Sequence, residues 1–263
     1  MSKAADYDRR AVETGDAPAG RSWRNIVPEP LRRRLRPGVE AWRRTRHARP
    51  PKLGDLRRLT PIDSNWGFER GRPLDRVYIE HFLEQHRADI RGRVLEASGS
   101  KYTRRFGTTV DRADVLDVVA DNPNATIVGD LIDAPQIPDA SFDCVILTQV
   151  LQFVYDVRAA FTTVARILEP GGVLLVTVPG ITKISPLEDE AFGDWWRFTA
   201  RSIRRLAEET FADSHVGVRS YGNVLTAAAF LYGLAESDLR PTEISAHDPS
   251  FEVVVALRVV TNS

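Results

Sequence analysis

The sequence predicts an α/β fold in which helices cover both faces of a mostly parallel sheet. From about residue 75 onward, short apolar runs of strand length alternate with amphipathic segments of helical length. The run 173–178 is apolar throughout, which is typical of a strand buried on both faces. A chain of 263 residues with 43% hydrophobic residues is long enough for one such domain and an extension.

Each element is predicted from its own pattern of apolar residues and terminal signals. Asp156 and Thr199 stand where N-caps are expected, and Pro170-Gly171-Gly172 ends the helix before the clearest strand. The strands are expected at residues 93–96, 109–115, 125–128, 143–147, 173–178, 216–220 and 251–260. The helices are expected at residues 76–86, 156–168, 199–211 and 224–233.

The charge is unevenly divided along the chain. Residues 1–60 hold 16 Lys and Arg against 7 Asp and Glu, whereas the remainder holds 20 against 29. We expect residues 1–60 to be a basic extension, partly disordered or short-helical because prolines interrupt it. Residues 61–263 are expected to form the folded domain, with an N-terminal cap over 61–90. The extension is either a solvated leader or a patch for anionic partners such as a membrane surface, and the acidic remainder gives no reason to expect nucleic acid as a partner.

The number of cysteines and the length of the apolar runs exclude two classes of protein, those held by disulfides and those that cross a membrane as a helix. Cys144 is the one cysteine, so the sequence excludes an intramolecular disulfide and a cysteine-based zinc site. No apolar run approaches the ~18–20 residues of a membrane helix. The sequence therefore predicts a cytoplasmic protein.

Polar residues recur where the predicted strands end. Ligands of parallel α/β sheets bind outside the carboxyl ends of the strands. The small-residue turn Ser98-Gly99-Ser100 follows Glu96, and Asp130 follows the third strand. Asp114, with Asp111 and Asp117 as rivals, is the carboxylate expected after the second strand. Such a set suits a nucleoside, since a carboxylate can accept both ribose hydroxyls and a small turn lets backbone N–H groups approach the ligand.

Longer motifs in the same region resemble a known family. Residues 130–143 end in Ser141-Phe142-Asp143, and residues 168–174 read Leu-Glu-Pro-Gly-Gly-Val-Leu. Together with residues 148–152, these runs are similar to the S-adenosylmethionine (SAM)-dependent methyltransferases of the type 11 kind. The resemblance covers roughly residues 93–261 and implies a class I Rossmann-like sheet of seven strands, mostly parallel with the last strand antiparallel.

The resemblance also implies a SAM cofactor and a role for each matching residue. Those implied to bind SAM are Glu96, Ala97, Ser98 and Gly99 at its methionine end, Asp114 at the ribose, Asp130 and Leu131 beside adenine, and Thr148 and Gln149 below the sulfonium. One departure stands out, because the family's Gly-x-Gly is Ser98-Gly99-Ser100 here. The serine Cβ disfavours a positive φ and a close approach to the ligand.

A narrower likeness concerns the methyl acceptor. Residues 66–80, the run Trp195-Trp196-Arg197 and His247-Asp248 resemble a bacterial subgroup found beside glycosyltransferases, which implies a saccharide or glycolipid acceptor. Trp195, Trp196 and Arg197 are therefore predicted to bind the acceptor. His247 and Asp194 are predicted to be the catalytic groups, since a sugar hydroxyl needs a general base.

Several alternatives stay open from the sequence. The acceptor could be another small metabolite or a lipid headgroup, and the chain could be a catalytically silent partner of a glycan-synthesis assembly. The acidic residues 188–194 suit Mg²⁺, but a solvated loop explains them as well, and no metal is predicted. The apolar segment 224–233 could cover the acceptor or form a homodimer contact. No Gly-x-Gly-x-x-Gly follows the first strand, which disfavours a dinucleotide-dependent dehydrogenase.

Overall fold

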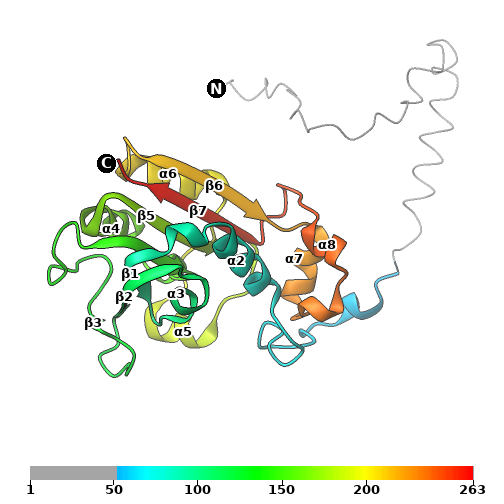
Figure 1. Ribbon diagram of the computed structural model, residues 1–263. Helices are drawn as coiled ribbons and strands as arrows, with labels where there is room; N and C mark the ends of the chain where they lie inside the picture. The colour runs from blue at the N-terminus through cyan, green and yellow to red at the C-terminus, as the bar shows by residue number, and fades with distance from the viewer. Residues whose placement is uncertain (1–51, 263) are drawn as a thin grey trace, which may run out of the picture. The chain divides into compact units, whose positions relative to one another are not determined.

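The structure, a computed structural model, describes residues 52–262. Its centre is a seven-stranded sheet with the order β3-β2-β1-β4-β5-β7-β6. All pairs are parallel except those of β7, which runs antiparallel to β5 and β6. The strands are β1 Arg91–Ala97, β2 Thr109–Asp117, β3 Ile127–Val128, β4 Phe142–Thr148, β5 Leu168–Pro179, β6 His215–Tyr221 and β7 Val254–Val260 (Figure 1). The predicted Rossmann-like fold is confirmed.

The helices agree with the prediction where the sequence carries a long period and a cap. Asp156 accepts a hydrogen bond from Ala159 N at the start of α4, and Thr199 forms a capping box with Ser202 at the start of α6. The helices are α2 Leu74–Gln85, α3 Lys101–Phe106, α4 Val157–Ile167, α5 Pro186–Phe192, α6 Ala200–Thr210, α7 Val224–Leu231 and α8 Pro241–Ser245. The short 3-10 helices are η2 Gly54–Arg57, η3 Arg87–Asp89, η4 Leu151–Phe153 and η5 Glu236–Asp238.

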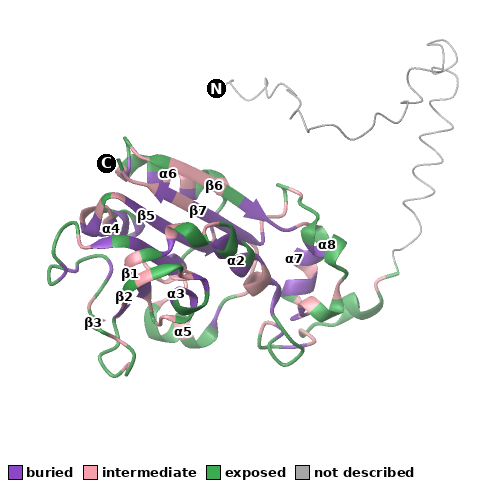
Figure 2. Ribbon diagram, viewed as in Figure 1, coloured by how far each residue is buried: buried purple, intermediate pink, exposed green. Residues whose placement is uncertain are grey.

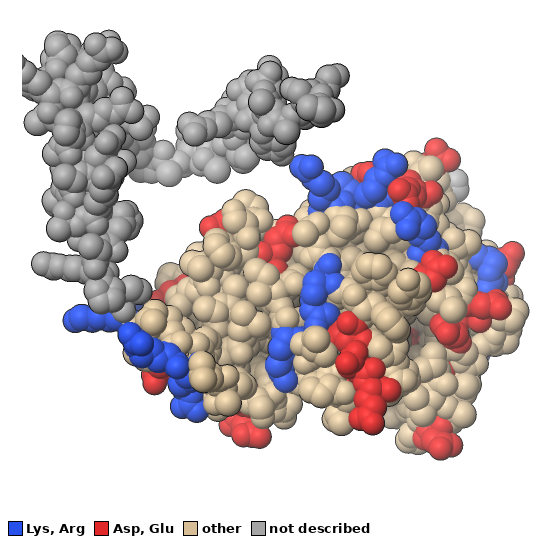
Figure 3. Space-filling view, turned by 180° about the vertical axis from the view of Figure 1, so that it is seen from behind, with Lys and Arg blue, Asp and Glu red and all other residues tan. Residues whose placement is uncertain are grey.

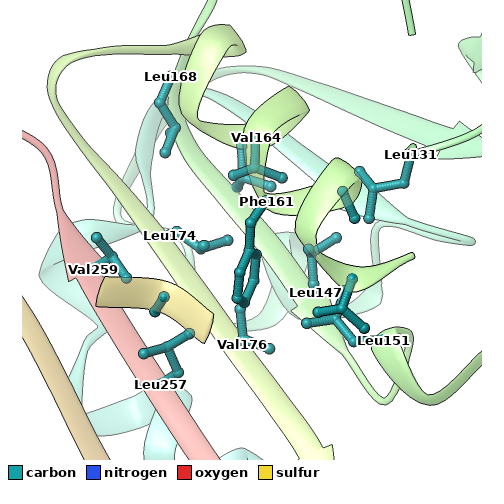
Figure 4. Packing of buried hydrophobic residues seen from close by; sticks show 14 of the residues in the cluster. Leu131, Leu147, Leu151, Phe161, Val164, Leu168, Leu174, Val176, Leu257 and Val259 are labelled. Atoms are coloured by element: carbon teal, nitrogen blue, oxygen red, sulfur yellow. The ribbon is translucent and has the colours of Figure 1, made fainter. Parts of the chain in front are cut away.

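Both faces of the sheet are covered, as the apolar central strands require. Alternate residues of each strand enter two separate clusters: Leu95 and Val145 face α4 and α6, whereas Val94 and Cys144 face α2 and α7. The burial of the central strands is visible in Figure 2. Phe161 projects from α4 toward Val176 of β5 in the first cluster (Figure 4). Burial of this kind stabilises the fold by about 25 cal/mol per Å² of apolar surface.

The turn before β5 shows why the predicted helix 156–168 ends one residue early. Leu168 already pairs with Phe142 of β4, so it belongs to the sheet. Gly171 then takes a φ of 77°, which a residue with a side chain rarely adopts. The Pro-Gly-Gly run therefore lies near the start of β5, after the helix has already ended at Ile167.

The part of the chain before the domain is described only in part. Residues 59–262 lie in one compact unit, and η2 belongs to the segment before it. Most of the predicted basic extension, residues 1–51, lies outside the described residues. In the segment that the structure describes, no helix combines the length and apolar character needed to cross a membrane. On the face seen in Figure 3, acidic and basic side chains are interspersed among uncharged surface.

Candidate functional site

A cavity of about 790 Å³ lies at the carboxyl ends of the parallel strands. This first cavity takes its walls from four successive strand ends, as the topology rule predicts. It is lined by Ala97 and Ser98 after β1, residues 116–119 at the end of β2, residues 129–132 after β3, and residues 148–150 and 153–156 after β4, with Glu188, Phe192 and Trp195 at its side. Its volume lies in the range usual for small-molecule sites.

The turn after β1 keeps its tight shape although it lacks the first glycine. Ser98 takes a φ of 62°, so the serine Cβ does not prevent the left-handed conformation that the sequence made doubtful. Ser98 N donates to Leu116 O at 2.9 Å, which ties the turn to β2. A Cβ on Gly99 would meet no atom within 4 Å, so this glycine is not required by crowding.

The carboxylate of Glu96 is hydrogen-bonded to the helix α3. It is buried at the end of β1, and its carboxylate accepts hydrogen bonds from Tyr102 N, Thr103 N and Thr103 Oγ1 at 3.0, 2.7 and 2.7 Å. Burial raises the pKa of Glu96, and these hydrogen bonds oppose the rise. Glu96 thus holds the first turn of α3, whose N–H groups otherwise lack partners, and it does not line the cavity.

The carboxylate at the end of β2 is Asp117, and Asp114 lies three residues before it, within the strand. Asp114 lies inside the strand, only 1% exposed, and accepts hydrogen bonds from Arg93 Nε at 2.7 Å and Arg112 Nη2 at 2.9 Å. Burial opposes the shift, but these partners hold the pKa of Asp114 below its usual range. The predicted strand end at residue 115 was two residues early, and of the three candidates only Asp117 lines the first cavity.

Asp130 and Leu131 lie where the sequence places them. Both line the first cavity, and Asp130 Oδ1 accepts a hydrogen bond from Ile132 N at 3.0 Å. Leu131 is buried in the hydrophobic cluster that includes α4. Ile132 is 39% exposed and lines the cavity together with Val118 and Val119. The cavity therefore combines carboxylates with apolar walls.

Thr148 and Gln149 join the first cavity to a second one. Both line each cavity, as do Phe153 and Glu188. Gln149 has a φ of 55°, a strained conformation that clusters at functional sites. Its buried side-chain Nε2 lacks a hydrogen-bond partner, and so does Oε1 of buried Gln152. Polar atoms without partners at this junction suit a ligand or an ordered water.

The second cavity, of about 600 Å³, is lined by both acidic and basic side chains. Arg197 binds Asp194 through both of its carboxylate oxygens, at 2.5 and 2.8 Å, and Ser185 N donates to the same carboxylate. Burial opposes it, but Arg197 and Ser185 hold the pKa of Asp194 below its usual range. Asp194 lines the cavity as predicted, yet a carboxylate held in this way is a weak proton acceptor.

Residues that the sequence did not single out also line the second cavity. Asp75 and Arg76 reach it from the first turn of α2, and Lys183 from the segment after β5. Lys183 Nζ lies 3.6 Å from the ring centroid of Trp66 and donates to Ser64 O at 2.7 Å. Burial lowers the pKa of Lys183. Only the spatial neighbourhood reveals these residues, because no spacing in the sequence relates α2 to the strand ends.

The adjacent residues Trp195 and Trp196 have different positions relative to the first cavity. Trp195 lines the first cavity, and its ring lies 5.1 Å from that of Tyr155. Trp196 lines neither cavity and donates through Nε1 to the carbonyls of Val154 and Tyr155. The predicted acceptor-binding cluster is therefore divided, and only Arg197 of the three lies at the second cavity.

His247 lines neither of these two cavities, and its role as catalytic base stays a prediction. Its Nε2 is 3.1 Å from Ser220 Oγ, beside a third cavity of about 420 Å³. That cavity shares no lining residue with the other two. The His-Asp pair follows α8 and lies at the carboxyl end of β6, which through β7 is in register with the carboxyl end of β5. The pair is therefore at the same edge of the sheet, two strands beyond β5.

A metal centre is not apparent in the described residues. Among residues 52–262, no group of three His, Cys, Asp or Glu side chains is placed to hold a metal ion. Glu188 and Asp189 of the acidic segment lie in the first turn of α5, and Glu188 accepts a hydrogen bond from Ser185 Oγ.

The sequence matches known proteins over part of its length. Residues 91–176 match the family model described as a methyltransferase domain. A curated protein of Mycolicibacterium smegmatis, named "Probable S-adenosylmethionine-dependent methyltransferase", is 38% identical over 87 residues, which are 33% of this chain and 34% of that protein. The match thus spans about a third of the relative's length. Residues 91–176 are thus similar to a methyltransferase domain.

Solved structures of low sequence identity also resemble the chain. A SAM-dependent methyltransferase of Archaeoglobus fulgidus is 12% identical with a TM-score of 0.43, covering 70% of this chain and 98% of its own. The phosphoethanolamine N-methyltransferase 2 of Haemonchus contortus, solved with phosphomonomethylethanolamine and S-adenosylhomocysteine, is 15% identical with a TM-score of 0.43, covering 74% and 59%.

Proposed function

We propose that this chain, with its methyltransferase domain over residues 91–176, transfers a methyl group from SAM to an oxygen of a small polar acceptor. The observation that carries the proposal is the pair of joined cavities at the carboxyl edge of the sheet. A cofactor and an acceptor that react must meet at one point, and Thr148 and Gln149 provide that point because they line both cavities.

The residues of the first cavity fit the adenosyl group. Asp117 would accept hydrogen bonds from the ribose hydroxyls, and Asp130 with the adjoining backbone would lie at the adenine edge. Ile132 and Val118 offer apolar surface to the two faces of the base. The backbone of the turn at Ser98 would lie beside the methionine portion of SAM.

The chemistry divides between cofactor and chain. When bound, SAM supplies an electrophilic methyl group that moves to the attacking oxygen as the carbon–sulfur bond breaks. The chain holds the acceptor in line and excludes water, which supplies much of the rate. Glu188 is our candidate for the proton acceptor because it lines both cavities. Asp194 would orient Arg197.

A saccharide acceptor is our first choice within this proposal. The second cavity offers amide and hydroxyl groups that suit sugar hydroxyls, from Asn65, Gln152 and Thr182. The ring of Trp66 also lines it and can stack on a sugar face.

A lipid-linked headgroup is the second choice, and one observation favours it. Phe68 and Leu187 line the second cavity, although they are 49% and 78% exposed. Apolar side chains at the entrance of a polar cavity would suit an acceptor with an apolar tail.

Mass spectrometry of glycans and lipids from a deletion strain tests the proposal. We expect one glycan or glycolipid to lose the mass of a methylene group, and the intact chain to restore it. A chain with Asp117→Arg, which places a cation in the first cavity, should not restore it. An unchanged glycan and lipid profile, or methyl transfer from SAM to protein or nucleic acid only, would contradict the proposed acceptor class.

A further inference from the structure

The first cavity has no cation for the amino-acid end of SAM. Every charged residue that lines it is acidic, namely Asp117, Asp130, Asp156 and Glu188. The methionine portion of SAM carries a carboxylate and an ammonium group. A carboxylate among four acidic side chains would be repelled, so its partner must come from outside the first cavity.

The first turn of α2 brings a matched pair of charges to the joined second cavity. Asp75 and Arg76 both line it, with Arg76 Nε 3.9 Å from Asp75 Oδ2. Arg76 Nη1 lies 3.4 Å from Tyr102 OH. Tyr102 stands in the first turn of α3, directly after the turn Ser98–Ser100, of which Ser98 lines the first cavity. The pair therefore lies on the side of the site where the methionine portion would leave the nucleoside.

The other cations of the second cavity are more strongly engaged. Arg197 is held by both oxygens of Asp194. Lys183 donates to Ser64 O at 2.7 Å and rests on the ring of Trp66. The contacts of Arg76 with Asp75 and Tyr102 are longer than good charge-assisted hydrogen bonds, so its guanidinium keeps donors for a carboxylate.

We propose that Arg76 binds the carboxylate of SAM and that Asp75 binds its ammonium group. This inference rests on the proposed function, since it adds residues to the same cofactor site. It replaces Glu96, whose carboxylate is occupied by α3. Burial raises the pKa of Asp75 although Arg76 opposes the rise, and a bound ammonium group would lower it again.

Two ligands that differ only in the amino-acid portion make a sharp test. S-adenosylhomocysteine carries the carboxylate and the ammonium group, whereas 5′-methylthioadenosine lacks both. Calorimetric titration of the full chain should show tighter binding of S-adenosylhomocysteine. Arg76→Ala should weaken that ligand about tenfold or more and change 5′-methylthioadenosine by less than about twofold. Asp75→Asn should act in the same direction, and Arg76→Lys should retain part of the affinity.

Control variants separate this inference from the proposed function. Lys183→Ala should leave both affinities near those of the unchanged chain. If Arg76→Ala leaves S-adenosylhomocysteine unaffected, or if it weakens both ligands equally, the inference is wrong. The same holds if Lys183→Ala alone removes the preference for S-adenosylhomocysteine. An unchanged chain that binds neither ligand would instead contradict the proposed function itself.

Discussion

Asp114 and Asp117 are three residues apart on β2, and their side chains have different surroundings. Asp114 is buried between two arginines, and Asp117 faces the first cavity. Acidic residues recur at 111, 114 and 117, so the sequence leaves the choice to the position of the strand end. The apolar pattern does not mark that end, and the pairing with Arg93 of β1 depends on a neighbour 21 positions away.

Removing the charge of Asp114 should lower stability and not act on the cofactor site directly. Asp114→Asn weakens the hydrogen bonds from Arg93 and Arg112, which should reduce the free energy of unfolding by roughly 1–3 kcal/mol. Chemical denaturation measures this loss. Asp111→Asn is the matched control, because Asp111 is exposed on the same strand and should change little. Equal losses in the two variants would contradict the buried pairing.

At the scale of elements, long helices were predictable and short ones were not. The helices α4 and α6 follow an apolar period and begin at Asp156 and Thr199, which the sequence identifies as caps. The six-residue helix α3 has no such period, and its first turn is held by Glu96 from β1. The segment α5, which places Glu188 between the cavities, was read as a loop for the same reason.

One ion pair fastens the short helix η3 to the last strand. Arg258 on β7 donates through Nε and Nη2 to the two oxygens of Asp89, both at 2.8 Å. Burial opposes the shift, but Arg258 and His86 hold the pKa of Asp89 well below its usual range. The bidentate geometry makes this pair stronger than an ordinary surface contact.

Asp89→Asn should therefore reduce stability in a pH-dependent way. Because the folded pKa is depressed, the stabilisation is present above the ordinary aspartate pKa of about 3.9 and is lost as the pH falls toward the folded value. At neutral pH we expect a loss of roughly 1–2 kcal/mol, moderated by the partial exposure of both side chains. Unfolding curves at several pH values should show the two proteins converging in acid.

The exposed pair Glu84 and Arg87 provides the control for that experiment. Its side chains are 54% and 51% exposed, so Glu84→Gln should change stability by less than about 0.5 kcal/mol at any pH. A constant difference between the Asp89 variant and the unchanged chain from neutral to acid pH would contradict the titration argument.

At the scale of the whole molecule, the sheet order determines where chemistry can occur. The alternation of strands and helices predicts a parallel sheet, and such a sheet brings its strand ends to one edge. That edge holds the first cavity, with Asp130 and Thr148 in their predicted places. The sequence could not predict the second cavity, because it is formed by α2, the segment after β5 and α7, which no local pattern relates.

The same limit applies to the position of His247. The sequence places it before the last strand, and the fold family suggested the rim of the site. The chain carries it to that edge of the sheet, but at the end of β6, on the far side of the antiparallel strand β7 from the first two cavities. The apolar helix α7 buries Ala227 and Phe230 while Val224 and Leu225 stay exposed, so a homodimer contact there stays a prediction. The predicted anionic partner of the basic extension, residues 1–60, likewise stays a prediction.

The structure of the full chain with S-adenosylhomocysteine tests the central claim most directly. We predict that the adenosyl group lies in the first cavity, with its ribose hydroxyls on Asp117, its base between Ile132 and Val118, and the edge of the base at Asp130. A ligand bound at the third cavity, or an adenosyl group that leaves Asp117 and Asp130 untouched, would contradict the account.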